Sequence, residues 1–261
     1  ALHHSASAPI TSDKAAVSQN LITVKTNTLD VHIDLSTGNL VKLGLVKYPV
    51  SIKEPNIPFT LMNTAPGKFY VSQSGLIDSN GNPLKVTYTT EQRKYVMSAS
   101  ENTMNVVLLG KTQNGLVVKK TYHFVKGQYV VDVKYSLTNN TAKTWAGSFY
   151  GQLTRQPQGS HGFLSGRSYH GASVSTKSKP YDEVKYKWLN ENSLSRDTKG
   201  GWIAVQQQYF LSAWVPVATE NNHYYSHTTF KTNDEGKAAN IYTVRFVAPQ
   251  MVVKSHQTKT S

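Results

Sequence analysis

The chain has 261 residues, of which 38% are hydrophobic and 16% charged, so neither a disordered chain nor a coiled coil is expected. It contains no cysteine, which excludes disulfides, thiolate metal sites and cysteine nucleophiles. Lys and Arg number 28 against 15 Asp and Glu, for a formal net charge of +13, and this balance favours nucleic acid, anionic lipid or an acidic protein surface as a partner.

The positive charge is spread along the chain rather than gathered in runs. Only local pairs occur, at Lys119–Lys120 and at Lys185/Lys187. No known nucleic-acid-binding signature is present, so solvated strand faces are the simpler interpretation and we predict no nucleic-acid partner. No stretch reaches the ~18 apolar residues of a transmembrane helix.

Residues 1–20 are rich in Ala and Ser and contain few large apolar side chains. Such a composition predicts a flexible tether rather than part of a packed core, and we do not expect His3 and His4 to bind a metal. After this segment the hydrophobic period becomes two. Residues 29–35 and 40–48 are typical of half-buried strands joined by a turn.

Residues 104–138 carry the clearest local pattern. An apolar run at 104–109 ends before the turn signal Asn114-Gly115. Two alternating segments follow, 116–124 and 129–137, with Lys126-Gly127 between them. Three strands joined by short turns form an antiparallel meander. Residues 224–230 and 240–247 alternate in the same way.

Residues 154–200 differ from the rest because glycines lie among Ser, Arg and His. The composition predicts a long irregular region, with one short strand at Val184–Leu189. Loops of this length are usually functional or mobile. This region and the basic strand faces are therefore our two candidates for a working surface.

Residues 199–216, KGGWIAVQQQYFLSAWVP, form the most apolar and aromatic stretch of the chain. Three glutamines interrupt it, which disfavours a membrane segment. Strand spacing leaves both faces mostly apolar, as in a strand covered on both sides. We predict a strand or a strand pair, bent near the glutamines, and an exposed ligand platform is the alternative. Few helical patterns occur anywhere, so the fold class is all-β, a large antiparallel sandwich.

Catalytic and metal-binding patterns are missing. His223 and His227 share a strand face but stand about 13 Å apart by strand rise, too far for one metal ion. The pairs Asp182-Glu183 and Asp234-Glu235 sit in turn-like contexts, where solvated residues are the simpler interpretation. No phosphate-binding loop, dinucleotide fingerprint or nucleophile elbow occurs. We predict no catalytic, cofactor-binding or metal-binding residues, and partner-binding residues stay unassigned.

Several segments together resemble one family. They include LITVKTNTLDVHIDLSTGNL, KTYHFVKGQYVVDVKYSLTNN, SYHGASVST and KGGWIAVQQQYFLSAWVP, in this order. The chain over about residues 21–248 is similar to the large periplasmic domain of the YidC-type membrane protein insertases of Gram-negative bacteria. The most specific part of the resemblance is carried by Gly200, Gly201, Trp202, Gln207, Gln208, Tyr209, Phe210, Ala213, Trp214 and Pro216.

The resemblance implies a β-supersandwich similar to the galactose mutarotase fold. It implies a location on the periplasmic face of the inner membrane, within a longer multi-pass protein. Residues 1–20 are then a tether after a first membrane helix, 21–250 the sandwich domain and 251–261 a C-terminal tail. Implied partners are inserting membrane proteins and the Sec translocon through its SecF component, with an insertase or chaperone role, no enzyme activity and no cofactor.

Two other functions stay open from the sequence. The implied fold is shared with sugar epimerases, so a carbohydrate-binding or epimerase-like protein is one alternative, although fold does not carry function. A module whose cleft holds an extended peptide or a sugar is the other. The charge of +13 adds the expectation that basic faces lie near anionic lipid or an acidic translocon surface.

Overall fold

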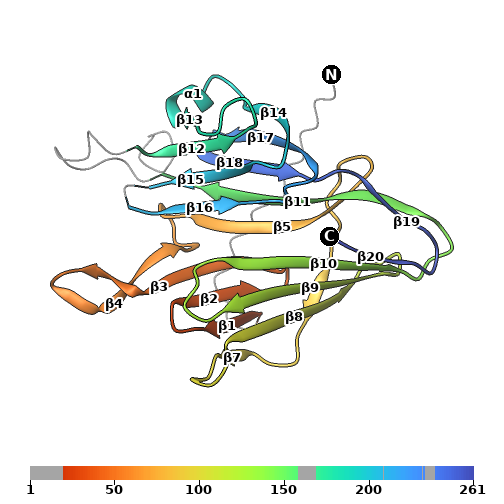
Figure 1. Ribbon diagram of the computed structural model, residues 1–261, viewed down its shortest axis with the longest axis horizontal. Coiled ribbons are helices and arrows are strands. Elements are labelled where there is room, and N and C mark those ends of the chain that lie inside the picture. The colour runs from red at the N-terminus through yellow and green to blue at the C-terminus, as the bar shows by residue number, and fades with distance from the viewer. Residues whose placement is uncertain (1–19, 158–168, 208, 231, 233–238) are drawn as a thin grey trace. The chain divides into compact units, whose positions relative to one another are not determined.

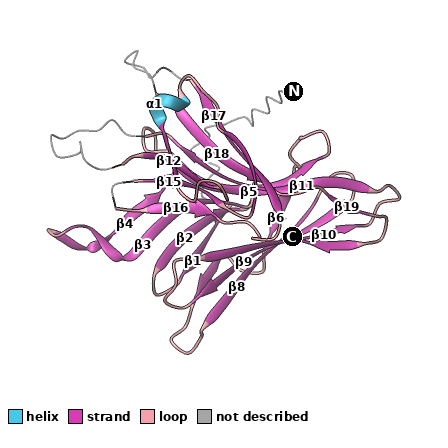
Figure 2. Cartoon of the chain, turned by 45° about the horizontal axis from the view of Figure 1, so that its top comes forward, coloured by secondary structure: helices cyan, strands magenta, loops and turns pink. Residues whose placement is uncertain are grey.

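The computed structural model describes residues 20–157, 169–207, 209–230, 232 and 239–261. Almost all regular structure is strand, and the helix in this part of the chain is one turn, α1 (Tyr186–Leu189) (Figure 2). The chain divides into two compact units. Unit 1 contains Ala1–Leu61, Gly75–Ser148 and Gln250–Ser261, and unit 2 contains Met62–Ser74 and Phe149–Pro249. The predicted flexible tether at 1–20 lies, except for Asn20, outside the described residues.

Unit 1 contains two sets of hydrogen-bonded strands (Figure 1). The first runs in the order β7 (Lys94–Val96), β1 (Leu21–Lys25), β2 (Leu29–Asp34), β3 (Asn39–Ser51) and β4 (Glu54–Met62). The second runs in the order β20 (Thr258–Thr260), β10 (Val131–Asn139), β9 (Leu116–Val125), β8 (Thr103–Lys111) and β6 (Thr87–Thr89). Strands β8, β9 and β10 are the antiparallel meander predicted from the alternation at 104–138.

The core of unit 1 follows the period-two pattern of these strands. Along β2 the side chains of Leu29, Val31 and Ile33 are buried, while the residues between them are partly exposed. Along β9 every second residue is buried, including Lys120. The Lys120 ammonium donates to the carbonyl oxygen of Gly38 at 2.6 Å, which joins the second sheet to the turn after β2. The two sheets therefore pack face to face.

Unit 2 is also built from two sets of strands. The first runs in the order β14 (Ser195–Lys199), β17 (Asn221–Thr229), β18 (Ile241–Val247), β11 (Trp145–Arg155) and β5 (Tyr70–Asp78). Of the last two strands, residues 149–155 and 70–74 belong to unit 2. The second is β13 (Asp182–Lys185), β12 (Gly171–Ser175), β15 (Trp202–Gln206) and β16 (Leu211–Trp214). Trp214 joins the two layers, since its ring lies 6.3 Å from Phe149 and 5.9 Å from Phe246 between centroids.

The sequence predicted either one strand or a strand pair at 199–216, and the structure contains a strand pair. Strands β15 and β16 pair antiparallel, with Ile203 opposite Trp214. The chain reverses at the glutamines, where the amide of Gln207 donates to the carbonyl of Phe210 at 2.8 Å. Burial on both faces is confirmed for the centre of β15 but not for β16, where Leu211 is half exposed. A single straight strand could not have placed Ile203 opposite Trp214.

The double glycine before this hairpin has a steric reason. Gly201 has a φ of +82°, and a Cβ there would lie 2.3 Å from the carbonyl oxygen of Ser175. A side chain at Gly201 is therefore excluded twice, by the left-handed conformation and by the close approach of another backbone. The carbonyl of Gly200, in turn, accepts the Tyr224 hydroxyl at 2.6 Å.

Two parts of the sequence prediction need correction. Residues 154–200 were expected to be largely irregular, yet their described part contains the end of β11 together with β12, β13, α1 and β14, and the predicted strand Val184–Leu189 is the end of β13 followed by α1. Residues 251–261 were expected to be a tail. They contain β19 (Met251–Val253), which pairs with the start of β11, and β20, which pairs with β10. The pattern missed these strands because they are only three to five residues long.

Candidate functional site: a charged groove beside an edge strand

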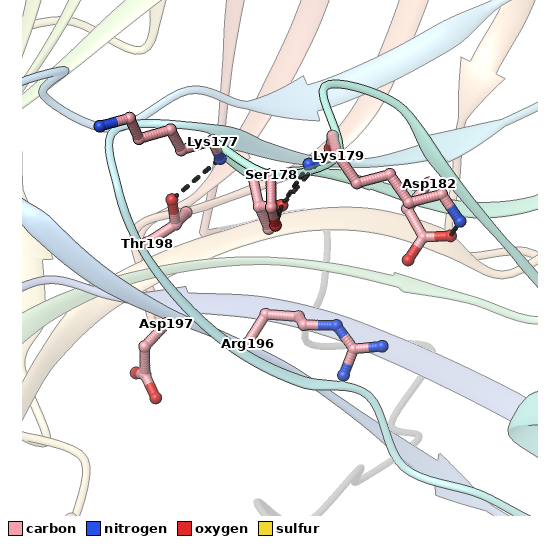
Figure 3. A pocket seen from close by; sticks show the side chains of 8 residues that line it. Lys177, Ser178, Lys179, Asp182, Arg196, Asp197 and Thr198 are labelled. Atoms are coloured by element: carbon pink, nitrogen blue, oxygen red, sulfur yellow. Dashed lines mark hydrogen bonds and ion pairs between the residues drawn. The ribbon is translucent and has the colours of Figure 1, made fainter.

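An open groove lies in unit 2, between the β12–β13 connection and β14 (Figure 3). The connection begins at Thr176, and its backbone is held to β14 by a hydrogen bond from the amide of Lys177 to the Thr198 hydroxyl at 3.2 Å. The groove thus falls inside the region 154–200 that the sequence marked as a candidate surface. Its ionisable side chains are Lys177, Lys179, Asp182, Arg196 and Asp197.

The charges of the groove are only partly neutralised. Lys179 pairs with Asp182 at 2.6 Å between Nζ and Oδ1. The Asp197 carboxylate contacts the His223 ring, with 2.8 Å between Oδ1 and Nδ1, the distance of a hydrogen bond. Among the described residues no ion pair forms at Lys177 or Arg196, and the Arg196 guanidinium extends beside the groove (Figure 3). The site therefore offers two cations to an acidic group.

Strand β14 forms one wall of the groove and is an edge of its sheet. Among the described strands it pairs with β17 alone, in a register that runs from Ser195 opposite Tyr225 to Lys199 opposite Asn221. An edge strand presents unpaired backbone N–H and C=O groups. No proline interrupts the sequence SRDTK, so every residue of β14 keeps its donor. An extended peptide can add to such an edge by main-chain hydrogen bonds.

A second polar surface of unit 2 is centred on Arg245, in β18. Its guanidinium donates to the side-chain oxygen of Gln152 and, at 2.8 Å, to the Tyr225 hydroxyl. It also stacks on the Tyr150 ring, 4.6 Å from the centroid, and burial raises the pKa of that tyrosine. Gln152 then donates to Gln73 at 2.7 Å. These side chains form hydrogen bonds with one another, so the network is better suited to stiffening the sheet than to acid–base catalysis.

The residues weighed from the sequence lie as follows. His223 and His227 are on one face of β17, opposite Val247 and Thr243, and each is far from the other. In the described part of the chain no group of three or more His, Asp or Glu side chains could hold a metal ion. No described helix has the length and apolarity needed to cross a membrane.

The pair Asp182-Glu183 differs from what its turn-like context predicted. Asp182 and Glu183 begin strand β13, so they point to opposite faces. Asp182 is held by Lys179, while Glu183 accepts the Tyr181 hydroxyl at 3.3 Å. The pair Asp234-Glu235 lies outside the described residues. Sequence reasoning had not singled out Arg196, because nothing in the sequence indicates that its strand lies at a sheet edge.

The sequence of the chain is similar to that of proteins of one known family. The family described as the YidC periplasmic domain matches residues 21–261. A membrane protein insertase YidC from Coxiella burnetii (strain RSA 331) is 44% identical over 235 residues, which cover 89% of this chain and 41% of that protein. The corresponding protein of Legionella pneumophila (strain Paris) is 38% identical over 253 residues, 95% of this chain and 44% of that one. The chain thus spans less than half the length of these relatives.

The fold is similar to that of a galactose mutarotase related enzyme from Lactobacillus acidophilus. The TM-score is 0.53, with 92% of this chain and 95% of that chain covered, and the sequences are 7% identical. At this identity the likeness concerns the fold alone. It confirms the all-β, mutarotase-like sandwich expected from the sequence, and the family match confirms the resemblance carried by residues 199–216.

Proposed function

The chain belongs to the YidC periplasmic domain family, and from this membership we propose that it serves a membrane protein insertase that assists the insertion and folding of inner-membrane proteins. The family places the domain on the periplasmic side of the inner membrane. Insertion would be performed by the longer protein of which the relatives are examples. The domain itself would act by contacting partners rather than by catalysis.

We further propose that the groove beside β14 is the contact site, for an acidic, extended segment of a partner such as the SecF component of the Sec translocon. The observation that carries this proposal is the combination of a proline-free edge strand with two cations that form no ion pair in the described structure, Lys177 and Arg196. The edge supplies main-chain hydrogen bonds, and the cations select for acidic side chains.

Site-directed cross-linking tests this proposal. The chain has no cysteine, so in a full-length protein whose cysteines outside this chain are replaced by serine, Ser178→Cys in the groove gives a unique attachment point for a photoactivatable cross-linker in native membranes. We expect cross-links to a translocon subunit from this position and none from Leu109→Cys, an exposed site on β8. Adding Arg196→Glu to the first variant should reduce the yield several-fold. Equal yields from both positions would remove the groove assignment.

The insertase role itself is tested separately. In cells depleted of their own insertase, the full-length protein should restore insertion of a reporter inner-membrane protein. Failure to restore insertion, with normal protein levels in the membrane, would refute the role. It would leave the groove open as a binding site of another kind.

A carbohydrate-active function is the second candidate, and the mutarotase-like fold is what favours it. Such chemistry needs a general acid and a general base that converge on a sugar. The Arg245 network contains amide, guanidinium and phenol groups that are bonded to one another. Polarimetry of fresh α-glucose with the purified chain decides the question, because catalysed mutarotation would replace our proposal.

A further inference from the structure

Strands β3 and β4 form a ribbon that projects from unit 1. Beyond Leu45, β3 runs past the ends of β1 and β2 (Figure 1). Residues 46–58 are exposed at every position, whereas residues 43–45 just before them are buried. A hairpin with both faces in solvent contributes nothing to a core. We call residues 46–58 the β3–β4 ribbon.

One face of the ribbon is apolar. In β3, Val46, Tyr48 and Val50 alternate with Lys47, Pro49 and Ser51, and in β4, Pro55 and Ile57 alternate with Glu54, Asn56 and Pro58. The turn between the strands consists of Ile52 and Lys53. A two-residue turn places its flanking residues opposite each other, and the Ser51 hydroxyl indeed bonds Glu54 at 3.3 Å. Next to the turn, Val50 and Pro55 therefore share the opposite face.

The exposure of these side chains is high. Ile52 at the tip is 98% exposed, and Ile57 is 52% exposed. The apolar face continues onto the β9–β10 loop, where the Tyr129 ring lies 5.9 Å from that of Tyr48 and Val130 is 70% exposed. Contiguous exposed apolar patches mark sites of protein or membrane interaction.

The loop that extends the patch is fixed in place. The amide of Gly127 donates to the Asn27 side chain at 2.8 Å, and the Thr28 hydroxyl donates to the carbonyl of Gln128 at 2.7 Å. The β1–β2 turn thus holds the loop, so that Tyr129 meets the ribbon. The apolar surface has a defined shape from the ribbon tip to Val130.

The edge of the ribbon is unsuited to strand addition. Strand β4 is joined to the sheet through β3, yet it carries Pro55 and Pro58, which have no backbone donor, and β3 carries Pro49. Prolines on an edge strand protect it against pairing with another strand. A second copy of the chain or an extended peptide would therefore find few hydrogen bonds here. This is the reverse of β14, which has no proline.

We propose that the β3–β4 ribbon docks on an anionic phospholipid bilayer, with its apolar face and tip at the headgroup–acyl boundary. Ile52 and Val50 supply aliphatic surface, and Tyr48 suits the interface because its ring is apolar and its hydroxyl polar. Lys53 lies next to Ile52 in the turn, where its charge complements anionic headgroups, whereas Lys47 and Glu54 lie on the other face of the ribbon. The chain as a whole carries a net charge of +13. Binding of this kind scales with buried apolar area and with electrostatic attraction.

The inference rests on the proposed function only for the nearness of a membrane. The test uses protein-free vesicles and needs no insertase activity. Its failure would therefore leave the proposed function untouched, and failure of the insertion assay would leave this proposal untouched.

An environment-sensitive fluorophore on Ile52→Cys in the 261-residue chain reports insertion directly, since no other cysteine exists. The matched control is Val217→Cys, an exposed aliphatic position in unit 2. Vesicles contain phosphatidylethanolamine with 30% phosphatidylglycerol, or phosphatidylcholine alone. We expect a blue shift and quenching by brominated lipid at position 52 on anionic vesicles, and neither at position 217.

Two unlabelled variants measure the contributions by vesicle flotation. Val50→Ser with Ile52→Ser should weaken binding at least about tenfold, and Lys53→Gln about fivefold on anionic vesicles. Circular dichroism should show the same strand content in all of them, because every substituted side chain is exposed.

Several results would overturn the proposal. These are no response at position 52 with any protein-free vesicle, equal responses at positions 52 and 217, or equal binding to phosphatidylcholine. A response only to native membranes that contain protein would assign the ribbon to a protein partner. A concentration-dependent dimer that disappears in Ile52→Ser would assign it to a second copy of the chain.

Discussion

The buried lysine of unit 1 offers a sharp test of the core. Lys120 is fully buried on the inner face of β9, and burial holds its pKa well below the usual 10.5. Its ammonium and the Tyr122 hydroxyl both donate to the carbonyl of Gly38, each at 2.6 Å. Replacing Lys120 with Met removes one donor but leaves that carbonyl bonded to Tyr122. The carbonyl of Gly38 therefore keeps a donor, and we expect Met to be accommodated.

The sign of the effect follows from proton binding. The Lys120 ammonium lies 5.0 and 5.2 Å from the ring centroids of Tyr122 and Tyr135, contacts worth up to about 2 kcal/mol each when desolvated. Desolvating the ammonium costs several kcal/mol, and this cost dominates its pKa. The unfolded chain, where lysine titrates near ~10.4, therefore binds more protons than the folded chain between the lowered pKa and ~10.4.

The free energy of unfolding therefore rises with pH across that window, by up to about 1.4 kcal/mol per pH unit, because the unfolded chain holds the lysine proton there and the folded chain does not. Lys120→Met lacks this dependence. We expect the variant to be more stable than the parent at pH 7.5, by about 1–3 kcal/mol. The difference should shrink steadily as the pH approaches ~10.4.

Urea denaturation at pH 7.5, 8.5 and 9.5 measures the difference. Lys119→Met is the matched control, since Lys119 is the exposed neighbour on the same strand and its removal should produce no such pH dependence. The reasoning is refuted if Lys120→Met is less stable than the parent at pH 7.5 by more than about 1 kcal/mol and the gap is the same at pH 9.5. That result would mean that the ammonium is charged and well stabilised in the core.

The remaining predictions concern packing. Trp214→Ala should lower the free energy of unfolding in urea by up to about 3 kcal/mol, the low end for an aromatic core residue, because Trp214 is only partly buried. An unchanged stability would restore the view of this residue as a ligand platform. Gly147→Ala should be strongly destabilising, because its Cβ would lie 2.1 Å from the carbonyl oxygen of Ile77. Gly44→Ala, whose Cβ would meet no atom closer than 3.6 Å, should cost little, and equal thermal shifts of the two variants would contradict this steric argument.

The sequence predicted the strands that carry a regular alternation. In the meander of β8, β9 and β10, short turns join strands of nine or ten residues, so both period and boundaries were visible. Short strands such as β12 and β14 carry too few residues to show a period. The groove could therefore be located to a region, but not to residues such as Arg196.

The hairpin of β15 and β16 shows a different reason for failure. Its turn contains Tyr209 and Phe210 rather than the glycine or asparagine of a tight turn. The apolar pattern continues through the reversal, so the sequence does not show where the chain turns back. Tyr209 is 80% exposed, which a continuous buried strand would not allow.

The same alternation has opposite meanings in β2 and in the β3–β4 ribbon. In β2, Val31 and Ile33 are completely buried by a second sheet, whereas Val50 and Ile57 in the ribbon are about half exposed. The hydrophobic period does not distinguish the two cases, because it reports a shared face and not what covers that face. The difference comes from the length of β3, which runs beyond its neighbours. An apolar face that the chain builds, fixes at its base and protects with prolines at its edge is therefore best explained by a surface outside the chain, and a fluid bilayer meets the requirement without needing a free strand edge.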